Sequence, residues 1–187
     1  MSSKLSRALG LDQVRPTAAE VDSPMPGDAL ISRPDAVMDR AFTLRASPED
    51  VWPWLVQLGK GRAGWYMTHR VERVVPRSRR ASRIVDQRWQ HLVVGSVIPD
   101  YGGRDETFTV AEIDPPHTLV HTSRRGRTDV TWAIAVAPLD PGSARVRLRL
   151  RMGPVRRKWL VAVAGEAIDL VTISWLAGGL RERVGPG

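Results

Sequence analysis

The stretch Ser47–Tyr66, SPEDVWPWLVQLGKGRAGWY, decides how the rest of the chain is interpreted. Ser47 is a favourable N-cap residue and Pro48 suits the first helical position, so a helix begins here. Two acidic residues follow in the first turn, where they favour the positive end of the helix dipole. Pro53 lies inside the helix and predicts a short, bent one. The apolar residues recur with the spacing of one buried face; they are Val51, Trp54, Leu55 and Leu58.

The helix is followed by GKGRAG, residues 59–64, which matches the dinucleotide pattern G-x-G-x-x-G literally. In a dinucleotide fold this loop leaves a strand and opens a helix, so that backbone N–H groups meet the pyrophosphate. Here the loop follows a helix instead. We therefore interpret the glycines as a helix stop and a tight turn, and we expect no cofactor.

The whole stretch resembles a signature of the START-like (SRPBCC) superfamily, in an actinobacterial-type group with the pattern A-P-E-x-V-W-P-W-L-V-Q-x-G-x-G-R-A-G-[FW]-Y. The resemblance covers about residues 20 to 184. It implies an α+β helix-grip fold, in which a curved antiparallel sheet of about six or seven strands surrounds a long C-terminal helix, with two small helices after the first strand. The second small helix is expected from Trp65 to Val75. This chain departs from the group at His69, where Asp is usual, and at Arg70, where Trp is usual.

The length of 187 residues suits one domain with a full core and is too short for two ordinary domains. Residues 1–35 have weak periodicity and a turn-rich run, which predicts an irregular N-terminal arm. A similar segment in the resembled group implies that this arm packs on the single domain of residues 36–187. The first ten residues lack the apolar segment of a signal peptide, so we expect a cytoplasmic protein.

The formal net charge of +8 would suit an acidic partner such as nucleic acid or an anionic membrane surface. An arginine-rich coding bias gives the same charge without any such partner. We expect no nucleic acid partner, and we leave contact with an anionic membrane surface and the oligomeric state open.

Segments that alternate between apolar and polar residues predict a sheet. Asp114-Pro115-Pro116 and Asp140-Pro141-Gly142 are turn sequences, so the strands on either side of each should pair as antiparallel hairpins. The last strand carries a ladder of Arg145, Arg147, Arg149 and Arg151 on one face, which we expect to meet water or a partner. The predicted strands cover residues 37–45, 93–99, 107–113, 118–123, 128–138 and 144–152.

A long helix is predicted from residue 154 to about residue 184. Glu166 and Asp169 lie near its middle and argue against a membrane span, because a central acid largely cancels the gain from the apolar residues. These two acids also lie three residues apart on nearly one side of the helix. They are either cavity acids or a surface face paired with Arg or Lys. The residues expected to face the sheet are Leu160, Ala164, Ile168 (or Ala167), Val171, Trp175 and Gly178.

The sequence offers little for metal, phosphoryl or thiol chemistry. It contains no cysteine, no H-E-x-x-H, no G-x-S-x-G and no Walker loop. Its four histidines, His69, His91, His117 and His121, lack the spacing of metal ligands, so we predict no metal site. We interpret His117 and His121, near a strand and its turn, as histidines that are hydrogen bonded within the protein or solvated, and not as ligands.

The aromatic residues suggest a cavity between the sheet and the long helix, because aromatic walls with a few polar groups suit a flat or lipid-like ligand. Each of these aromatics also suits an ordinary core position. The candidate ligand-binding residues are Trp54, Trp65, Tyr66, His69, Trp89, Tyr101, Trp132, Glu166 and Trp175.

Three functions are consistent with this sequence. The first is binding of a hydrophobic small molecule, lipid or polyketide-like, in the cavity. The second, which the resemblance suggests, is a cofactor-free enzyme of the polyketide aromatase/cyclase or dehydratase type, with His69, Tyr66 or Glu166 moving protons. The third is a basic interaction module that presents the arginine ladder to an acidic partner.

Overall fold

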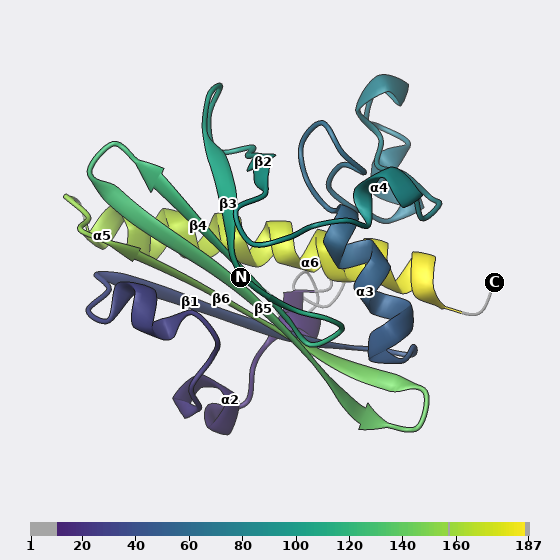
Figure 1. Ribbon diagram of the computed structural model, residues 1–187, viewed down its shortest axis with the longest axis horizontal. Helices are drawn as coiled ribbons and strands as arrows, with labels where there is room; N and C mark the ends of the chain where they lie inside the picture. Colours follow the sequence, from purple (N-terminus) through teal and green to yellow (C-terminus); the bar gives the residue numbers. More distant parts are fainter. Residues whose placement is uncertain (1–10, 157, 186–187) are drawn as a thin grey trace.

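The computed structural model describes residues 11–156 and 158–185 and has an α+β helix-grip fold (Figure 1). A six-stranded antiparallel sheet, in the order β1-β6-β5-β4-β3-β2, holds the long helix α6 across one face. The predicted fold class is confirmed. The strands are β1 (Ala36–Leu44), β2 (Val97–Pro99), β3 (Thr107–Asp114), β4 (Thr118–Arg125), β5 (Thr128–Asp140) and β6 (Ser143–Gly153). The helices are α2 (Ala18–Asp22), α3 (Pro48–Gln57), α4 (His69–Glu72), α5 (Lys158–Leu160) and α6 (Glu166–Val184), with 3-10 turns η1 (Leu11–Val14), η2 (Asp28–Ile31), η3 (Arg77–Arg79) and η4 (Gln87–Trp89) and a π-helical turn η5 (Val161–Gly165).

The sheet is built from the hairpins that the turn sequences predict. The proline turn of residues 114–116 joins β3 to β4, and that of residues 140–142 joins β5 to β6. Strand β6 lies between β5 and β1 and pairs with β1 from Ala36 opposite Met152 to Leu44 opposite Ala144. Because side chains alternate along a strand, this register sends Val146 and Leu148 toward α6 and the arginine ladder to the opposite face.

Helix α3 begins and ends where the sequence predicts. The Ser47 hydroxyl accepts a hydrogen bond from the Asp50 amide, and Pro48 takes the first helical position. The helix ends at Gln57, and an antiparallel bridge joins Gly59 to Gly64. Gly61 and Gly64 have φ values of 71° and 87°, the left-handed region that glycine adopts without strain. The interpretation of GKGRAG as a helix stop and tight turn is therefore confirmed.

The second small helix is shorter than predicted. It covers only His69–Glu72, because Thr68 is its N-cap and accepts from the Val71 amide. The predicted start at Trp65 is wrong. Residues 65–68 instead run against α6, where Gly179 permits a close approach: a Cβ on Gly179 would lie 2.5 Å from the Met67 amide nitrogen.

The C-terminal helix presents a different face from the predicted one. Its buried apolar residues are Ile173, Leu176, Ala177 and Leu180, whereas Trp175 is 38% exposed. The prediction is wrong for the packed part of the helix, because apolar residues lie all round it and their spacing does not fix which side is buried. Ala164, Ile168 and Trp175 of the predicted face instead line the hollow between the helix and the sheet. The segment Val163–Val184 is long and apolar enough to cross a membrane by length and composition, but here it is the core helix of the domain.

The N-terminal arm covers the arginine ladder. Of the predicted arm, residues 1–10 lie outside the described residues, and residues 11–31 lie against the sheet. Turn η1 contacts α6 and β1, and Val14 is fully buried. The following segment crosses to the outer face, where Gly27 approaches so closely that a Cβ there would lie 2.6 Å from Val120 Cγ1. The arm therefore covers part of the outer face beside the edge strand β1.

Each arginine of the ladder binds a group within the chain. Arg145 donates to both carboxylate oxygens of Glu20, at 2.7 and 2.8 Å. Arg149 and Arg151 each donate to Asp28, at 2.9 Å. The fourth, Arg147, donates to the Glu20 carbonyl. The prediction that this ladder meets water or an external acidic partner is wrong, because its acids are Glu20 and Asp28 of the arm and Asp39 of β1.

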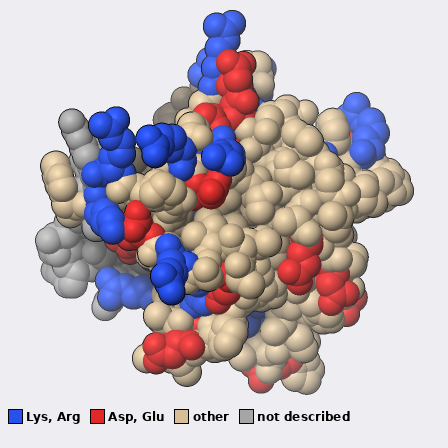
Figure 2. Space-filling model, turned by 60° about the vertical axis from the view of Figure 1, so that its left-hand side comes forward, with Lys and Arg blue, Asp and Glu red and all other residues tan. Residues whose placement is uncertain are grey.

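The surface charge is correspondingly mixed. Figure 2 shows lysine and arginine side chains with acidic side chains beside several of them, next to a broad area without charged residues. The net charge of +8 is thus not gathered on the ladder, and the basic interaction module loses its structural basis.

The space between α6 and the sheet is filled at one end and hollow at the other. At the end beside α3, the core includes Phe42, Leu55 and Leu176, each at most 2% exposed. Helices α3 and α4 gather at this end (Figure 1). Toward the N-terminal end of α6 the packing stops, and the candidate site lies there.

Candidate functional site

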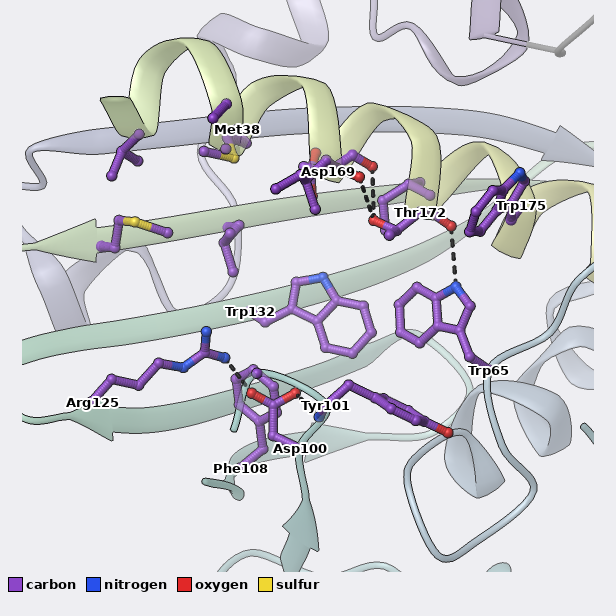
Figure 3. Close-up of a pocket in the computed structure, with 18 of the residues that line it drawn as sticks. Met38, Trp65, Asp100, Tyr101, Phe108, Arg125, Trp132, Asp169, Thr172 and Trp175 are labelled. Carbon is purple, nitrogen blue, oxygen red and sulfur yellow. Dashed lines mark hydrogen bonds and ion pairs between the residues drawn. The ribbon is translucent and has the colours of Figure 1, made fainter. Parts of the chain in front are cut away.

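A cavity of about 670 Å³ lies between the sheet and the first half of the C-terminal helix (Figure 3). Its floor comes from β1, β3, β5 and β6, and its roof comes from η5 and α6. The lining residues are Met38, Trp65, Met67, Asp100, Tyr101, Gly102, Phe108, Arg125, Trp132, Leu150, Met152, Val161, Ala164, Gly165, Ile168, Asp169, Thr172, Ile173 and Trp175.

The cavity exists because the roof carries short side chains. Turn η5 reads VAVAG, and Ala164 and Gly165 leave space above the sheet that larger residues fill elsewhere. A Cβ at Gly165 would lie 2.8 Å from Met38 Cε, so a side chain at this position would collide with Met38. The π-helical turn interrupts the helix at this point, a feature that is frequent at functional sites.

Aromatic rings form the wall opposite the rim. Trp65 follows the glycine turn, and its Nε1–H donates to the Thr172 carbonyl at 3.1 Å. Trp132 projects from β5, and its ring stacks on that of Trp65 with centroids 6.0 Å apart. Tyr101 meets Trp65 edge-on at 6.3 Å. Figure 3 shows Trp65 and Trp132 pointing into the space below α6.

The rim lies between α6 and the segment of residues 100–102. Tyr101 is 54% exposed, and Ile168 on the opposite side is 64% exposed, although both line the cavity. Asp100 and Arg125 form an ion pair at this edge. Because these two charges neutralise each other, the rim holds no excess charge for an ionic ligand.

Besides Asp100 at the rim, the carboxyl group of Asp169 lines the cavity. Asp169 Oδ2 is 2.9 Å from Arg40 Nε, and the side chains of Asp169 and Arg40 are 14% and 8% exposed. Burial raises the pKa of Asp169 to about 6; the Arg40 charge opposes this shift, and Glu166 and Asp39 add to it. Arg40 also donates to Glu166 at 2.6 Å. The two helix acids therefore share a buried arginine, and only Asp169 faces the cavity.

Four of the predicted ligand-binding residues meet at the cavity: Trp65, Tyr101, Trp132 and Trp175. The other five do not line it. Trp54 and Tyr66 lie in the solid core, where the Tyr66 hydroxyl donates to the Trp54 carbonyl at 2.9 Å. Burial raises the pKa of the Tyr66 hydroxyl, which makes it a poor proton donor at neutral pH.

The remaining predicted residues face away from the cavity. Trp89 packs under the Arg62 guanidinium, 4.6 Å from its ring centroid. The His69 amide donates to Glu182 at the opposite end of α6, and Glu166 has a 49% exposed side chain paired with Arg40. The three candidate catalytic residues His69, Tyr66 and Glu166 thus lie outside the cavity lining.

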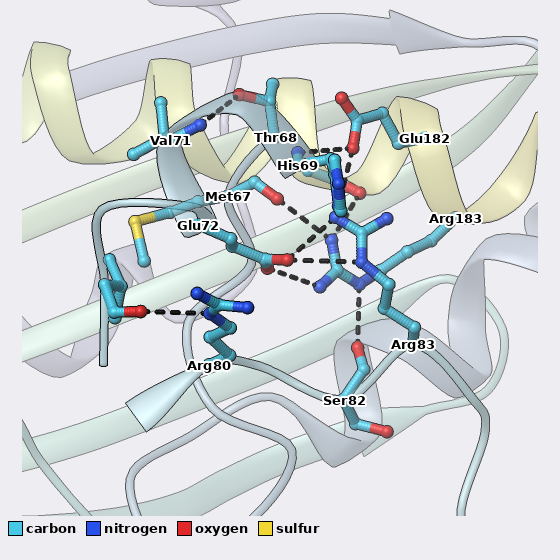
Figure 4. A network of polar contacts seen from close by, with 12 residues as sticks. Met67, Thr68, His69, Val71, Glu72, Arg80, Ser82, Arg83, Glu182 and Arg183 are labelled. Atoms are coloured by element: carbon cyan, nitrogen blue, oxygen red, sulfur yellow. Dashed lines mark hydrogen bonds and ion pairs between the residues drawn. The ribbon is translucent and has the colours of Figure 1, made fainter. Parts of the chain in front are cut away.

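An ion-pair network fixes α4 to the end of α6 (Figure 4). Glu72 accepts from Arg183 at 2.8 Å and from Arg83 at 2.7 Å, and the Arg183 side chain is only 1% exposed. Arg183 also lies over the Tyr66 ring at 4.5 Å. This network holds the segment that carries Trp65, so it supports the cavity wall from behind.

The sequence did not predict several lining residues, among them Phe108, Asp100 and Arg125, nor Arg40, which does not line the cavity but pairs with Asp169. Arg40 had a usable signal, because it lies on the same face of its strand as Met38 and Phe42 and a charge there needs a buried partner. Among the described residues, no group of three His, Cys, Asp or Glu side chains could hold a metal ion.

Comparison with known proteins supports the fold. No protein-family model matches the chain, and no curated protein matches it in sequence. Among solved structures, the hypothetical protein jhp0584 from Helicobacter pylori is similar with a TM-score of 0.55 and 15% identity, over 86% of this chain and 95% of that one. Protein CV1439 from Chromobacterium violaceum has a TM-score of 0.51 and 17% identity, over 81% of this chain and 98% of that one. At this identity the similarity shows the shared fold alone.

Proposed function

We propose that this protein binds a hydrophobic small molecule, flat or lipid-like, between the sheet and α6. The observation that carries the proposal is the 670 Å³ hollow between the sheet and α6, lined mostly by apolar and aromatic side chains. A cavity of this size lies within the range of about 300 to 1,000 Å³ that is usual for small-molecule sites.

The chemistry of the walls indicates an apolar ligand. Trp65, Trp132 and Phe108 offer ring faces, and Met38 and Met152 offer flexible apolar side chains that adapt to irregular shapes. The charged groups are already paired, Asp100 with Arg125 and Asp169 with Arg40. An ionic ligand would have to break one of these pairs, whereas an apolar ligand would leave both intact.

A second candidate is an enzyme that uses the same cavity, of the cyclase or dehydratase type. Asp169 favours it, because an acid with a pKa of about 6 on an apolar wall can exchange a proton near neutral pH. This role would replace the one considered for His69, Tyr66 and Glu166. The two candidates differ in one result: Asp169→Asn would retain ligand binding in both, but would abolish turnover if the protein is an enzyme.

The proposal is tested by titration with the neutral fluorescent probe N-phenyl-1-naphthylamine. The wild-type protein should bind one equivalent, with saturation and a blue-shifted emission. Ala164→Trp should weaken binding about tenfold or more, because the new indole would occupy the hollow. Ala167→Trp is the matched control, since Ala167 lies on the exposed side of the same helix. Equal binding by both variants, or no saturable binding by the wild type, would overturn the proposal.

A further inference from the structure

A second, much smaller chamber of about 40 Å³ adjoins the main cavity. The two share Trp65, Asp100, Tyr101, Phe108 and Trp132 as lining residues, so the aromatic wall of the main cavity is also the wall of the chamber. The chamber has room for a group the size of a water molecule, a hydroxyl or a carbonyl oxygen, and not for a ring.

His121 lines this chamber and is only 4% exposed. It lies on β4 directly opposite Trp132 on β5, and the two rings stack with centroids 5.5 Å apart and planes 24° apart. Phe108 meets the imidazole edge-on at 5.7 Å. The ring is thus held in one position by aromatic neighbours.

One ring nitrogen of His121 is buried without a hydrogen bond to any residue that the structure describes. This nitrogen is Nδ1. Buried polar atoms are nearly always paired, because an unpaired one loses its hydration without replacement. The residues around the chamber are mostly apolar, and the Asp100 carboxylate is engaged by Arg125 and by the Tyr101 amide. The Trp132 backbone approaches the ring but leaves Nδ1 without a hydrogen bond of good geometry, so an atom from outside the protein can serve as its partner.

The charge state of His121 limits which chemical groups can be its hydrogen-bond partner. Burial lowers the pKa of the imidazole to about 4; the Trp132 backbone opposes this shift and the Arg62 charge adds to it, so the ring is neutral at pH 7. A neutral imidazole offers one N–H donor and one acceptor nitrogen. It suits an uncharged hydroxyl or carbonyl and gives no charge with which to hold a carboxylate or phosphate.

We propose that His121 is the polar anchor of the ligand site: an apolar, ring-containing ligand lies in the main cavity, and an uncharged hydroxyl or carbonyl on it enters the small chamber and hydrogen bonds to Nδ1. This inference rests on the proposed function and adds the class of ligand, a neutral aromatic or polycyclic molecule with an oxygen substituent.

The test compares 2-naphthol with 2-methylnaphthalene, which has a methyl group of similar size in place of the hydroxyl. Both are competed against N-phenyl-1-naphthylamine on the wild type, on His121→Phe and on His121→Gln. In the wild type the hydroxyl should improve affinity by about 3- to 10-fold over the methyl group. His121→Phe should remove this preference, so that the two compounds bind with equal affinity, and His121→Gln should restore part of it. An equal preference in the wild type and His121→Phe would overturn the inference and leave the apolar cavity standing, whereas failure of the fluorescent probe to bind would overturn the proposed function itself.

A second measurement does not depend on the variants folding. Imidazole ¹⁵N resonances of the wild type report the hydrogen bonding of each histidine, and His117, whose Nδ1 is already 3.1 Å from the Val136 carbonyl, is an internal control. 2-Naphthol should shift the His121 Nδ1 resonance and 2-methylnaphthalene should not. No difference between the two compounds would mean that the chamber holds only a structural water, and the inference would be wrong.

Discussion

The indole rings of Trp65 and Trp132 lie with centroids 6.0 Å apart and planes 28° apart. One ring comes from the loop after α3 and the other from β5, so the pair joins the loop to the sheet. Both rings also line the main cavity and the chamber of His121. The integrity of this pair therefore governs both the size and the chemistry of the site.

Replacing Trp65 should weaken ligand binding. Trp65→Leu removes a ring face from the cavity wall and the N–H bond to Thr172, so we expect affinity for N-phenyl-1-naphthylamine to fall about 5- to 30-fold, as one lost aromatic contact of about 1 to 2 kcal/mol implies. Trp89→Leu is the control, because Trp89 packs on Arg62 outside the cavity. A similar loss of affinity in the control would contradict this assignment of the two tryptophans.

The stability of the protein should respond to pH through two opposing groups. The pKa of His121 is about 4 in the folded protein and 6.5 in the unfolded chain. Its contribution to the free energy of unfolding is therefore complete above pH 6.5 and is lost as the pH falls toward 4. The pKa of Asp169 is about 6 in the folded protein and 3.8 in the unfolded chain. Its contribution to the free energy of unfolding is therefore complete below pH 3.8 and is lost as the pH rises through 6. Each effect amounts to about 3 kcal/mol, and the two nearly cancel in the wild type between pH 4.5 and 6.

Single variants should expose each effect. The free energy of unfolding of His121→Phe should fall as the pH rises from about 4 to 6, and that of Asp169→Asn should fall as the pH drops over the same range. Urea denaturation at several pH values measures both slopes. The window lies above that of the salt-bridged carboxylates, of which Glu20 has a pKa of about 2 because Arg145 binds it. Slopes of the same sign in the two variants would show that these pKa shifts are wrong.

Gly179 should be far less tolerant of a methyl group than its neighbour Gly178. A Cβ at Gly179 would lie 2.5 Å from the Met67 nitrogen and 2.6 Å from the Tyr66 carbonyl carbon, which are backbone atoms that cannot move aside alone. Gly179→Ala should cost about 2 kcal/mol or more in thermal or urea unfolding and displace Trp65. A Cβ at Gly178 would meet only the Thr68 methyl, so Gly178→Ala should stay within about 1 kcal/mol of the wild type. Equal effects would argue against the close packing of this segment on α6.

Asp28 should anchor the N-terminal arm. It accepts from Arg149 and Arg151, whose side chains are 6% and 14% exposed. Asp28→Asn would remove the carboxylate that pairs with Arg151 and leave Arg149 with Asp39. We expect a loss of about 2 to 4 kcal/mol and faster proteolysis of the arm. Asp22→Asn, at an exposed position of α2, should change stability by less than about 0.5 kcal/mol. Protease resistance equal to that of the wild type would mean that the arm is held by its apolar contacts instead.

The two acids that bind Arg83 should differ sharply in their contribution to the stability of the protein. Glu72 is 4% exposed and also binds the buried Arg183, whereas Glu182 is 37% exposed. Glu72→Gln should therefore destabilise by about 3 kcal/mol and Glu182→Gln by less than about 1 kcal/mol. Chemical denaturation of the two variants measures the difference, and comparable losses would show that Arg183 is satisfied by its carbonyl partners alone.

Local signals predicted the fold well. Ser47 and Pro48 define the start of a helix, and the proline turns define hairpins. Both depend only on residues close together in the sequence, so they could be predicted from it. The partners of the arginine ladder could not, because Glu20 lies 125 residues before Arg145 in a segment without periodicity. Only the folded chain brings the two together.

The site was predicted in part, for the same reason. Aromatic side chains suit a core and a cavity wall equally, so nothing local separates Trp54, in the solid core, from Trp65, on the cavity wall. The difference depends on what lies opposite each ring: Leu176 and its neighbours fill one end of the interface, and Ala164 and Gly165 leave the other open. His121 was interpreted as a histidine that is hydrogen bonded within the protein or solvated, and its unpaired Nδ1 is visible only in three dimensions.

The tryptophans themselves give the most direct test of the cavity as a ligand site. Indole ¹H–¹⁵N resonances should be recorded while N-phenyl-1-naphthylamine is added to the wild-type protein. We expect large shifts for the three tryptophans that line the cavity, Trp65, Trp132 and Trp175. The resonances of Trp54 and Trp89, which do not line it, should stay unchanged. Shifts confined to Trp54 and Trp89, or none in the three cavity residues at saturation, would contradict the proposed ligand site.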